Sequence, residues 1–480
     1  MPYIFQSLAS PSSQAFSAGG IKDAMSSMRV SVSKKVRSSV DRLALQNDYS
    51  MVSISHIPVE LLGDIFRLYT NNPRAAPLGP RSYKAGRNPM VLAQVCSHWR
   101  NVATNLPALW TTIRISQPTK CHARLVNLWL ERAADQPLDV TLTELDNLIP
   151  AWAILTSLVA RSEFWKRIHI ALPLDLLSRF AQVLQSPRRC NMLESVQFYD
   201  HVIVSKQLFD CHIQNPGWTI PYLRDIWTFF YTSTSLRDVV WTGELETLAF
   251  NSSPFKQITS IELRFGIALD AEDAVSFMQL FPNLQAFHAR ISPPSSSHSA
   301  WKSHLPTSPI TFEHLDTLHL RLDSSISFLF AHITLPALRD LKLWSITCGI
   351  PLFHDFAVLD NFFRRSHCQL QKFHYDDRHA PESFMQEWGS LHSLQFLVSI
   401  YWTGKISDST VSLLTRCIEN GPHAVMPFLK DLHFTSCDTT DGMIAALLLS
   451  RASTLTDCSF YSKKGKGPID KRALSTWGLS

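Results

Sequence analysis

One short apolar pattern recurs along most of the chain and constrains its fold more than any other feature. The order apolar-x-x-apolar-x-apolar predicts a β-strand, because alternate side chains of a strand lie on one face. The order also occurs in WKRIHI at Trp165 and LRDVVW at Leu236, whereas LQFLVS at Leu394 fits it poorly. The clearest copies are LESVQF, ITSIEL, LQAFHA, LDTLHL, LRDLKL, LQKFHY, LKDLHF and LTDCSF, which begin at residues 193, 258, 284, 315, 338, 370, 429 and 455.

The segments between these strands have helical character. From Ile258 onward the copies begin about 23 to 35 residues apart, near the period of about 20–29 residues that is typical of a leucine-rich repeat. DAEDAVSFMQLF, VLDNFFRRS, DSTVSLLTRCIE and GMIAALLLSRA are helix-like segments between them. One strand-plus-helix unit cannot bury its own apolar face, so the units must stack side by side. We therefore expect an irregular, leucine-rich-repeat-like α/β solenoid over residues 117–480.

A different pattern occupies residues 51–116. In IPVELLGDIFRLY, Pro58 can occupy the first position of a helix, where its missing N–H costs nothing. The apolar residues that follow it share one helical face, as do those of VLAQVCSHWRNVA beyond a proline-rich loop. PALWTTI then supplies Trp110 as a large anchor. The pattern predicts a small all-α module ahead of the solenoid.

In order, spacing and residue type, this module resembles the F-box motif. It has Pro-x-Glu-Leu-Leu from Pro58, Ile-Phe at 65–66, Val-Cys-x-x-Trp-Arg at 95–100 and Pro-x-Leu-Trp at 107–110. The loop between its helices is long and basic, whereas most F-box proteins have a short acidic one; its basic residues are Arg74, Arg81, Lys84 and Arg87. This loop, and the segment LVNLWLERAADQPLDVTL, are similar to the fungal, basidiomycete-like F-box proteins that continue into irregular leucine-rich repeats.

The resemblance implies a substrate-recognition subunit of an SCF, cullin-RING ubiquitin ligase. The F-box would dock a Skp-type adaptor, and the solenoid would hold an unknown target protein. A module of about 60 residues has difficulty burying all its large apolar side chains, and exposed apolar surface marks an interface. Alternatively, these residues pack on the solenoid, or the chain is a non-ligase scaffold or protein-binding module. The expected adaptor-binding residues are Ile57, Pro58, Leu61, Leu62, Ile65, Phe66, Leu92, Val95, Cys96, Trp99 and Trp110.

The strand pattern also predicts where a target would bind. Residues between and after the core leucines lie on the opposite, concave face of the sheet. Three arginines recur in one slot of successive repeats, which favours acidic or phosphorylated groups of a target, although an ordinary solvated sheet face is the alternative. The expected substrate-binding residues are Arg264, His288, Arg290, His319, Arg321, Trp344, His374 and Tyr461.

Other classes of function have little support in the sequence. Motifs typical of nucleotide-binding loops, metalloproteases and serine hydrolases do not occur, so we expect no enzyme activity, no cofactor and no metal site. A net charge of +5 spread over 480 residues does not indicate a nucleic-acid partner. The longest apolar run, Met443 to Leu449, is far shorter than the roughly 20 residues that cross a bilayer.

The nine cysteines include no CxxC pair, which favours buried thiols in a reducing compartment. We therefore expect an intracellular protein, cytoplasmic and/or nuclear, without membrane contact. At the N-terminal end, residues 1–20 are expected to be disordered. Residues 21–50 are expected to form an amphipathic helix or a linker, because apolar residues recur every three or four positions.

Overall fold

The computed structural model describes residues 57–70, 89–143, 145, 147–185, 190–200, 221–241, 255–264, 267–293, 308–346, 356–388, 392–415, 425–462 and 465–477. The predicted disordered N-terminus, the amphipathic segment 21–50 and the basic loop of the F-box-like region lie outside these residues. So do the cysteines Cys211, Cys348 and Cys417.

A single sheet of thirteen parallel strands runs through the described residues, with neighbouring strands in chain order. Its strands are β1 (Thr112–Ser116), β2 (Leu138–Thr143), β3 (Trp165–Leu172), β4 (Ser195–Asp200), β5 (Asp238–Trp241), β6 (Ser260–Leu263), β7 (Ala286–Ile291), β9 (Thr317–Leu322), β11 (Asp340–Ser345), β12 (Lys372–Asp376), β13 (Ser399–Trp402), β14 (Asp431–Phe434) and β15 (Asp457–Phe460). A separate parallel pair consists of two short strands, β8 (Ile310–Thr311) and β10 (Ile333–Thr334).

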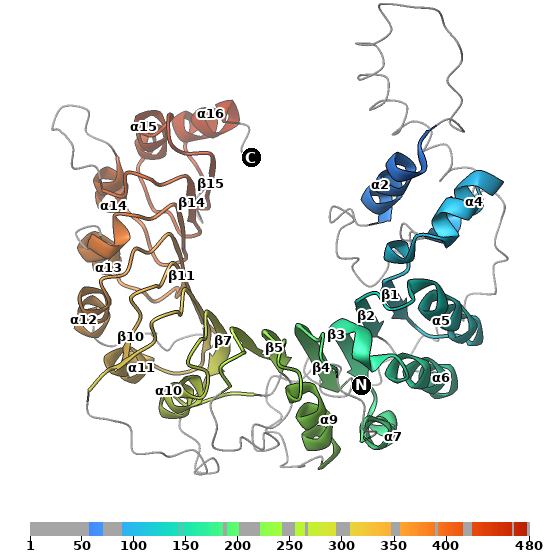
Figure 1. Cartoon of the computed structure of the whole chain (residues 1–480). Helices are drawn as coiled ribbons and strands as arrows, with labels where there is room; N and C mark the ends of the chain where they lie inside the picture. The colour runs from blue at the N-terminus through green and yellow to red at the C-terminus, as the bar shows by residue number, and fades with distance from the viewer. Residues whose placement is uncertain are drawn as a thin grey trace, which may run out of the picture.

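Helices connect the strands and cover one face of the sheet. They are α5 (Lys120–Ala133), α6 (Leu148–Val159), α7 (Leu174–Leu184), α9 (Pro221–Tyr231), α10 (Ala271–Gln279), α11 (Ser327–His332), α12 (Phe356–Ser366), α13 (Glu382–Trp388), α14 (Asp408–Leu414), α15 (Met443–Ser450) and α16 (Pro468–Thr476). The sheet lines the inside of a curved arc and the helices follow its outer side (Figure 1). The mixed α/β architecture of repeated strand-plus-helix units is confirmed.

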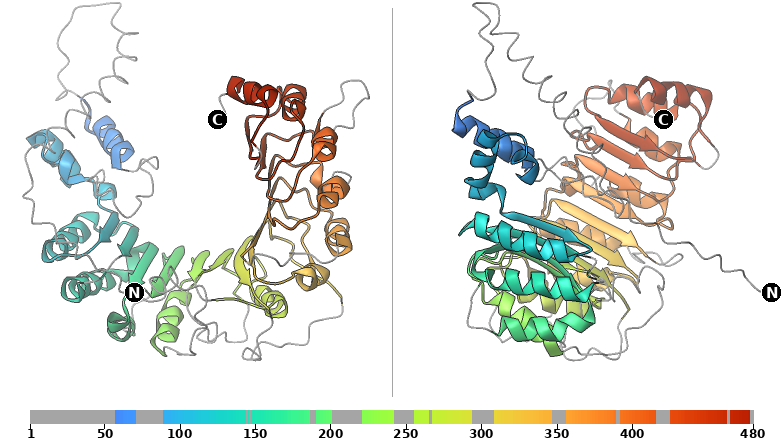
Figure 2. Two further views of the ribbon diagram at one scale, coloured as in Figure 1. Left: turned by 180° about the vertical axis from the view of Figure 1, so that it is seen from behind. Right: turned by 90° about the vertical axis from the view of Figure 1, so that its right-hand side faces the viewer.

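A helical module precedes the sheet. It contains α2 (Val59–Thr70), the short α3 (Pro89–Leu92), α4 (Ser97–Thr104) and the 3₁₀ turn η2 (Pro107–Leu109). The module lies at one tip of the arc, and α15 and α16 lie at the other (Figure 2). The sheet already begins with β1, inside the range predicted for the module, because Thr112–Ser116 pairs in parallel register with β2.

The core lies between the sheet and the outer helices. Burial alternates along most strands, as in β7, where Phe287, Ala289 and Ile291 are buried and the residues between them are half-buried. Each fully buried aliphatic or aromatic side chain stabilises the fold by about 1.5–3 kcal/mol relative to exposure. The predicted orientation of the repeat leucines toward the core is confirmed.

One predicted strand frame was wrong. LQFLVS was aligned on Leu394, but β13 begins at Ser399 and its pattern is LVSIYW, starting at Leu397. Leu397, Ile400 and Trp402 are the buried members. The shift arises because Leu394 belongs to a 3₁₀ turn, η6 (His392–Leu394), that precedes the strand and also buries its leucine.

Candidate functional site

The helical module has a tightly packed interior. Leu62 and Phe66 on α2 are completely buried, and the Phe66 ring meets the Trp99 ring of α4 edge to face at 4.9 Å. The indole N–H of Trp110 donates a 2.8 Å hydrogen bond to the carbonyl of Ala103 at the end of α4. These contacts hold α2 and α4 together with the turn before β1.

A second stripe of α2 remains uncovered. Leu61, Ile65 and Leu68 are 57%, 41% and 74% exposed. They are spaced i, i+4, i+7, which places them on one side of the helix, beside the buried stripe of Leu62 and Phe66. We call Leu61, Ile65 and Leu68 the exposed stripe of α2. Exposed aliphatic side chains that lie together in this way make the stripe a candidate protein interface.

The predicted adaptor-binding residues therefore divide into two groups. Pro58, Leu61, Ile65, Val95 and Cys96 are exposed, and Ile57 is half-buried. Leu62, Phe66, Leu92, Trp99 and Trp110 are buried within the described chain. The expectation that a module of this size has difficulty burying all its large apolar side chains therefore holds for the first group, whereas α4 and the following unit provide enough surface to enclose the second group.

Trp110 shows how the module joins the sheet. Its ring packs edge to face against Trp129 of α5, with ring centroids 5.0 Å apart. The guanidinium of Arg132, also on α5, lies 4.4 Å from the Trp110 ring centroid. The alternative considered from sequence, packing on the first unit of the repeats, applies to this tryptophan.

On the concave face, strand pairing aligns one residue from every strand into a row. The register runs from β1 to β15 without interruption through Arg114, Thr141, His169, Gln197, Val240, Glu262, His288, His319, Lys342, His374, Tyr401, His433 and Ser459. We call this set the concave row. Histidine provides five of its thirteen members, more than any other residue type.

Rings in the second half of the concave row contact one another across six adjacent strands. His288 and His319 stack with centroids 4.2 Å apart, and His374 and Tyr401 stack at 4.1 Å, nearly parallel. Trp344, two residues after Lys342 on β11, contacts one ring of each stacked pair. Its ring centroid lies 5.9 Å from that of His319 and 5.2 Å from that of His374. His433 continues the series at 6.3 Å from Tyr401. We call these six rings the aromatic strip.

Burial keeps part of this strip uncharged. Desolvation, with a smaller contribution from the neighbouring His319 ring, lowers the pKa of His288 to about 4. Desolvation also lowers the pKa of His374 to about 4. The Nε2 atom of His319 lies 3.1 Å from the Asp340 carboxylate. Burial alone would raise the pKa of Asp340, but the hydrogen bond and charge of His319 outweigh it and lower that pKa.

The three predicted arginines do not form a free cationic cluster. Arg264 forms a two-point ion pair with Glu262 on its own strand. Arg290 forms a 2.5 Å ion pair with Asp323, a largely buried carboxylate after β9. Arg321 is exposed and forms no ion pair with any residue that the structure describes. Internal carboxylates therefore neutralise two of the three guanidinium groups, and the third remains available.

The remaining predicted residues lie near this surface, while Tyr401, His433 and the nearby Asp323 were not among the expected substrate-binding residues. Trp344 and His374 belong to the aromatic strip, whereas Tyr461 follows β15 at the last strand and is largely exposed. Tyr401 was not expected because its strand was misaligned, and the LVSIYW pattern would have revealed it. Asp323 was missed because it lies 33 residues from Arg290 and meets it only through sheet pairing.

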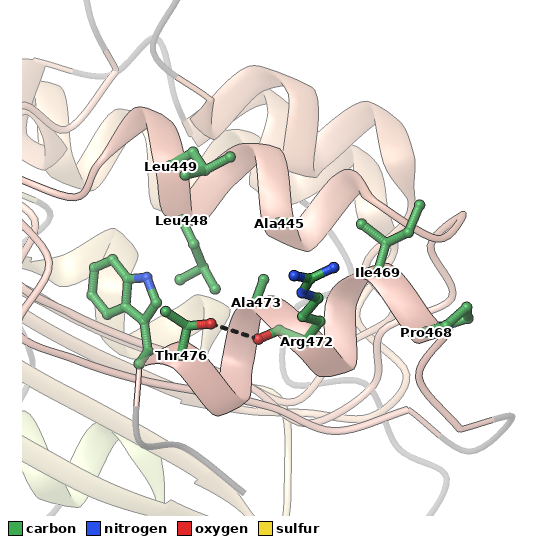
Figure 3. Close-up of a pocket in the computed structure, with 9 residues that line it drawn as sticks. Ala445, Leu448, Leu449, Pro468, Ile469, Arg472, Ala473 and Thr476 are labelled. Atoms are coloured by element: carbon green, nitrogen blue, oxygen red, sulfur yellow. Dashed lines mark hydrogen bonds between the residues drawn. The ribbon is translucent and has the colours of Figure 1, made fainter.

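A shallow apolar groove lies at the far end of the sheet, between α15 and α16 (Figure 3). The two helices cap each other: Asp441 accepts hydrogen bonds from the N–H groups of Ile469 and Asp470, and Asp470 accepts from those of Gly442 and Ala445. Gly467 permits this approach, since a Cβ there would collide with the Asp441 side chain. These hydrogen bonds join the N-terminal ends of the two helices that line the groove.

Within the described residues, no group of three His, Cys, Asp or Glu side chains is arranged to hold a metal ion. None of the described helices is both long and apolar enough to cross a membrane. Six cysteines are described, all as free thiols, and burial raises the pKa of Cys190, Cys368 and Cys458 to about 11 and that of Cys437 to about 12.

Comparisons with known proteins identify no family. No family model matches the chain, and no curated protein matches it. A solved structure from Bacteroides fragilis, determined by the Northeast Structural Genomics Consortium, is similar to it with a TM-score of 0.35 and 12% identity. The similarity covers 63% of this chain and 76% of that chain, and at this TM-score it supports no argument about function.

Proposed function

We propose that the chain is a substrate-recognition subunit of an SCF-type ubiquitin ligase. In this proposal the F-box-like helical module docks a Skp-type adaptor, and the leucine-rich-repeat-like sheet holds a target protein. The observation that carries the proposal is the exposed stripe of α2, Leu61, Ile65 and Leu68, within the segment whose sequence resembles the F-box. Aliphatic side chains that a folded module leaves in contact with water are suitable anchors for a partner.

The positions of the two surfaces support a receptor with two partners. The helical module lies at one tip of the arc, while the concave row runs along the inside of the arc (Figure 1). The exposed stripe of α2 and the concave row therefore lie on separate elements, so each can offer a contact surface of its own. Such a chain needs no catalytic group of its own, because holding a target near a separate enzyme raises its effective concentration.

The test is co-purification of the full chain with a Skp-type adaptor. The double variant Leu61→Glu, Leu68→Glu is expected to lose at least about tenfold in adaptor affinity, because each anchor would be replaced by a charge at a desolvated interface. Ile149→Glu and Leu449→Glu are the matched controls, since both aliphatic side chains are largely exposed but lie on α6 and α15.

Undiminished adaptor binding by a folded double variant would contradict the proposal. So would an equal loss in the two controls. If the wild-type chain itself binds no adaptor, the non-ligase alternative, a repeat protein that binds partners outside a ligase, takes its place. Substitution of Leu62 and Trp99 is unsuitable for this test, because both side chains are buried and their loss would unfold the module.

A further inference from the structure

The aromatic strip has the dimensions of a binding surface for an extended chain. It crosses six adjacent strands, from His288 on β7 to His433 on β14, without a gap between rings. Five strand spacings of about 4.8 Å correspond to about 24 Å. An extended peptide of about seven residues has that length. The rings are half-buried, so each one still presents part of its edge to solvent.

The strip is suited to apolar groups because several of its ring nitrogens are covered from solvent or already have a polar neighbour. The Nε2 atoms of His288 and His374 are covered from solvent and have no hydrogen-bond partner among the described residues. Such an environment disfavours the charged imidazolium, in agreement with the lowered pKa of both rings. The ring of His319 is oriented by Asp340. At neutral pH the rings of His288 and His374 are therefore uncharged.

The charges beside the strip favour a ligand with few acidic groups. Arg321 is exposed and unpaired within the described chain, and it lies in register with Trp344. Lys342, on the same strand as Trp344, is half-buried and forms no ion pair with any described residue. Carboxylates lie close by: Asp323 holds Arg290, Asp340 holds His319, and Asp376 is in register with Trp344. Because Asp323 and Asp340 are already paired, few free cationic groups remain beside the strip, and they match a ligand with one carboxylate better than a nucleic acid with many phosphates.

We propose that the aromatic strip binds an extended protein segment that crosses the strands, with apolar or aromatic side chains against its rings and a single carboxylate at Arg321. Trp344 is the central anchor, because it contacts His319 on one side and His374 on the other. The identity of this segment as part of a ubiquitination target rests on the proposed function, but its binding chemistry does not. The surface selects one acidic residue rather than an acidic or phosphorylated cluster.

The test selects ligands from random sequences, so the target itself need not be identified first. A phage-displayed library of random heptapeptides is panned on the full-length chain, and the affinities of enriched peptides are measured by fluorescence polarisation. Enriched peptides are expected to combine aromatic or aliphatic residues with one Asp or Glu. Trp344→Ala is expected to weaken them by about tenfold or more, as for a central aromatic anchor.

Two arginine variants provide the specificity test. Arg321→Gln is expected to weaken acidic peptides about fivefold and to leave their Asp→Asn or Glu→Gln versions unchanged, because only the carboxylate contact is lost. Arg264→Gln is the matched control and should change affinity less than about twofold, since Glu262 already occupies that guanidinium. Both variants alter surface groups, so their melting temperatures should match that of the wild type.

Several outcomes would overturn the proposal. Failure to enrich any peptide would do so, as would peptides that bind the Trp344→Ala variant undiminished. Equal sensitivity to Arg264→Gln and Arg321→Gln would instead indicate a general basic field. The adaptor assay separates this proposal from the first one: Trp344→Ala and Arg321→Gln should retain adaptor binding, and Leu61→Glu, Leu68→Glu should retain peptide binding.

Discussion

The helical module and the sheet both expose apolar groups, but they do so by different geometry. In the module, one helix supplies the whole exposed stripe, and a rotation of about 100° per residue separates it from the buried stripe beside it. In the sheet, each strand supplies one or two side chains, and pairing between strands assembles the aromatic strip. A surface on one helix depends on a few large contributions, whereas a surface across six strands depends on the register of all of them.

We expect the helical module to be less stable than the sheet. Truncation of a buried side chain in the module should therefore give the largest loss of stability. Phe66→Ala removes a fully buried ring in contact with Trp99 and is expected to destabilise the module by about 3–5 kcal/mol. Amide hydrogen exchange is expected to show loss of protection in α2 and α4, with β7 to β15 unaffected. Leu68→Ala, on the exposed side of the same helix, should change stability by less than about 0.5 kcal/mol.

The outcome of the Phe66 variant also measures how independent the two regions are. Trp110, Trp129 and Arg132 form the contact between them. Loss of protection in the C-terminal strands as well would show that module and sheet unfold as one cooperative unit.

Removal of a buried cation in the repeat region should have a somewhat smaller effect on stability. Arg451 is fully buried at the end of α15, and its guanidinium donates hydrogen bonds to the carbonyls of Leu414, Val425 and Met426. Arg451→Met keeps the apolar stem but leaves three carbonyls unsatisfied, which should cost about 2–4 kcal/mol. Chemical denaturation would measure the loss. Unchanged stability would contradict this expectation. It would mean that the desolvation cost of the buried guanidinium, which the variant removes, is as large as the contribution of the lost hydrogen bonds.

The smallest expected effect is a pH dependence that is confined to the sheet. The pKa values of His288 and His374 are about 4 in the folded chain, below the ordinary value of about 6.5. Between these values the unfolded chain binds more protons, so stability should decrease as pH falls from about 7 toward 4. The loss should be about 1 kcal/mol per histidine, since both rings are partly solvated.

A double variant isolates this contribution. The melting temperature of the double variant His288→Asn, His374→Asn should decrease less between pH 7 and pH 5 than that of the wild type. The lowered pKa of Asp340 acts in the same direction at more acidic pH, because its ionised form stabilises the fold. An identical pH slope in the variant and the wild type would contradict a role for these two rings.

Sequence reasoning was most accurate where a local pattern repeats. The LDTLHL copy places Leu318 and Leu320 in the core and His319 on the opposite face, as observed, because side-chain direction alternates along any strand. Sequence reasoning failed at β13, where the apolar patterns LQFLVS and LVSIYW overlap. The 3₁₀ turn before the strand also buries a leucine, so the first pattern could be mistaken for the strand. On α2, sequence periodicity identified one broad apolar face without showing that Leu62 would be covered and Leu61 left exposed.

By itself, the sequence determined the units: a helical module, strands with an inner and an outer side, and helices between them. These depend on short-range periodicity, which each segment carries within its own residues. Only the tertiary structure decided which side chains meet, including the pairing of Arg290 with Asp323 and the stacking of His374 on Tyr401. These contacts join segments far apart in the chain, and a shift of one residue in strand pairing would turn each side chain to the other face.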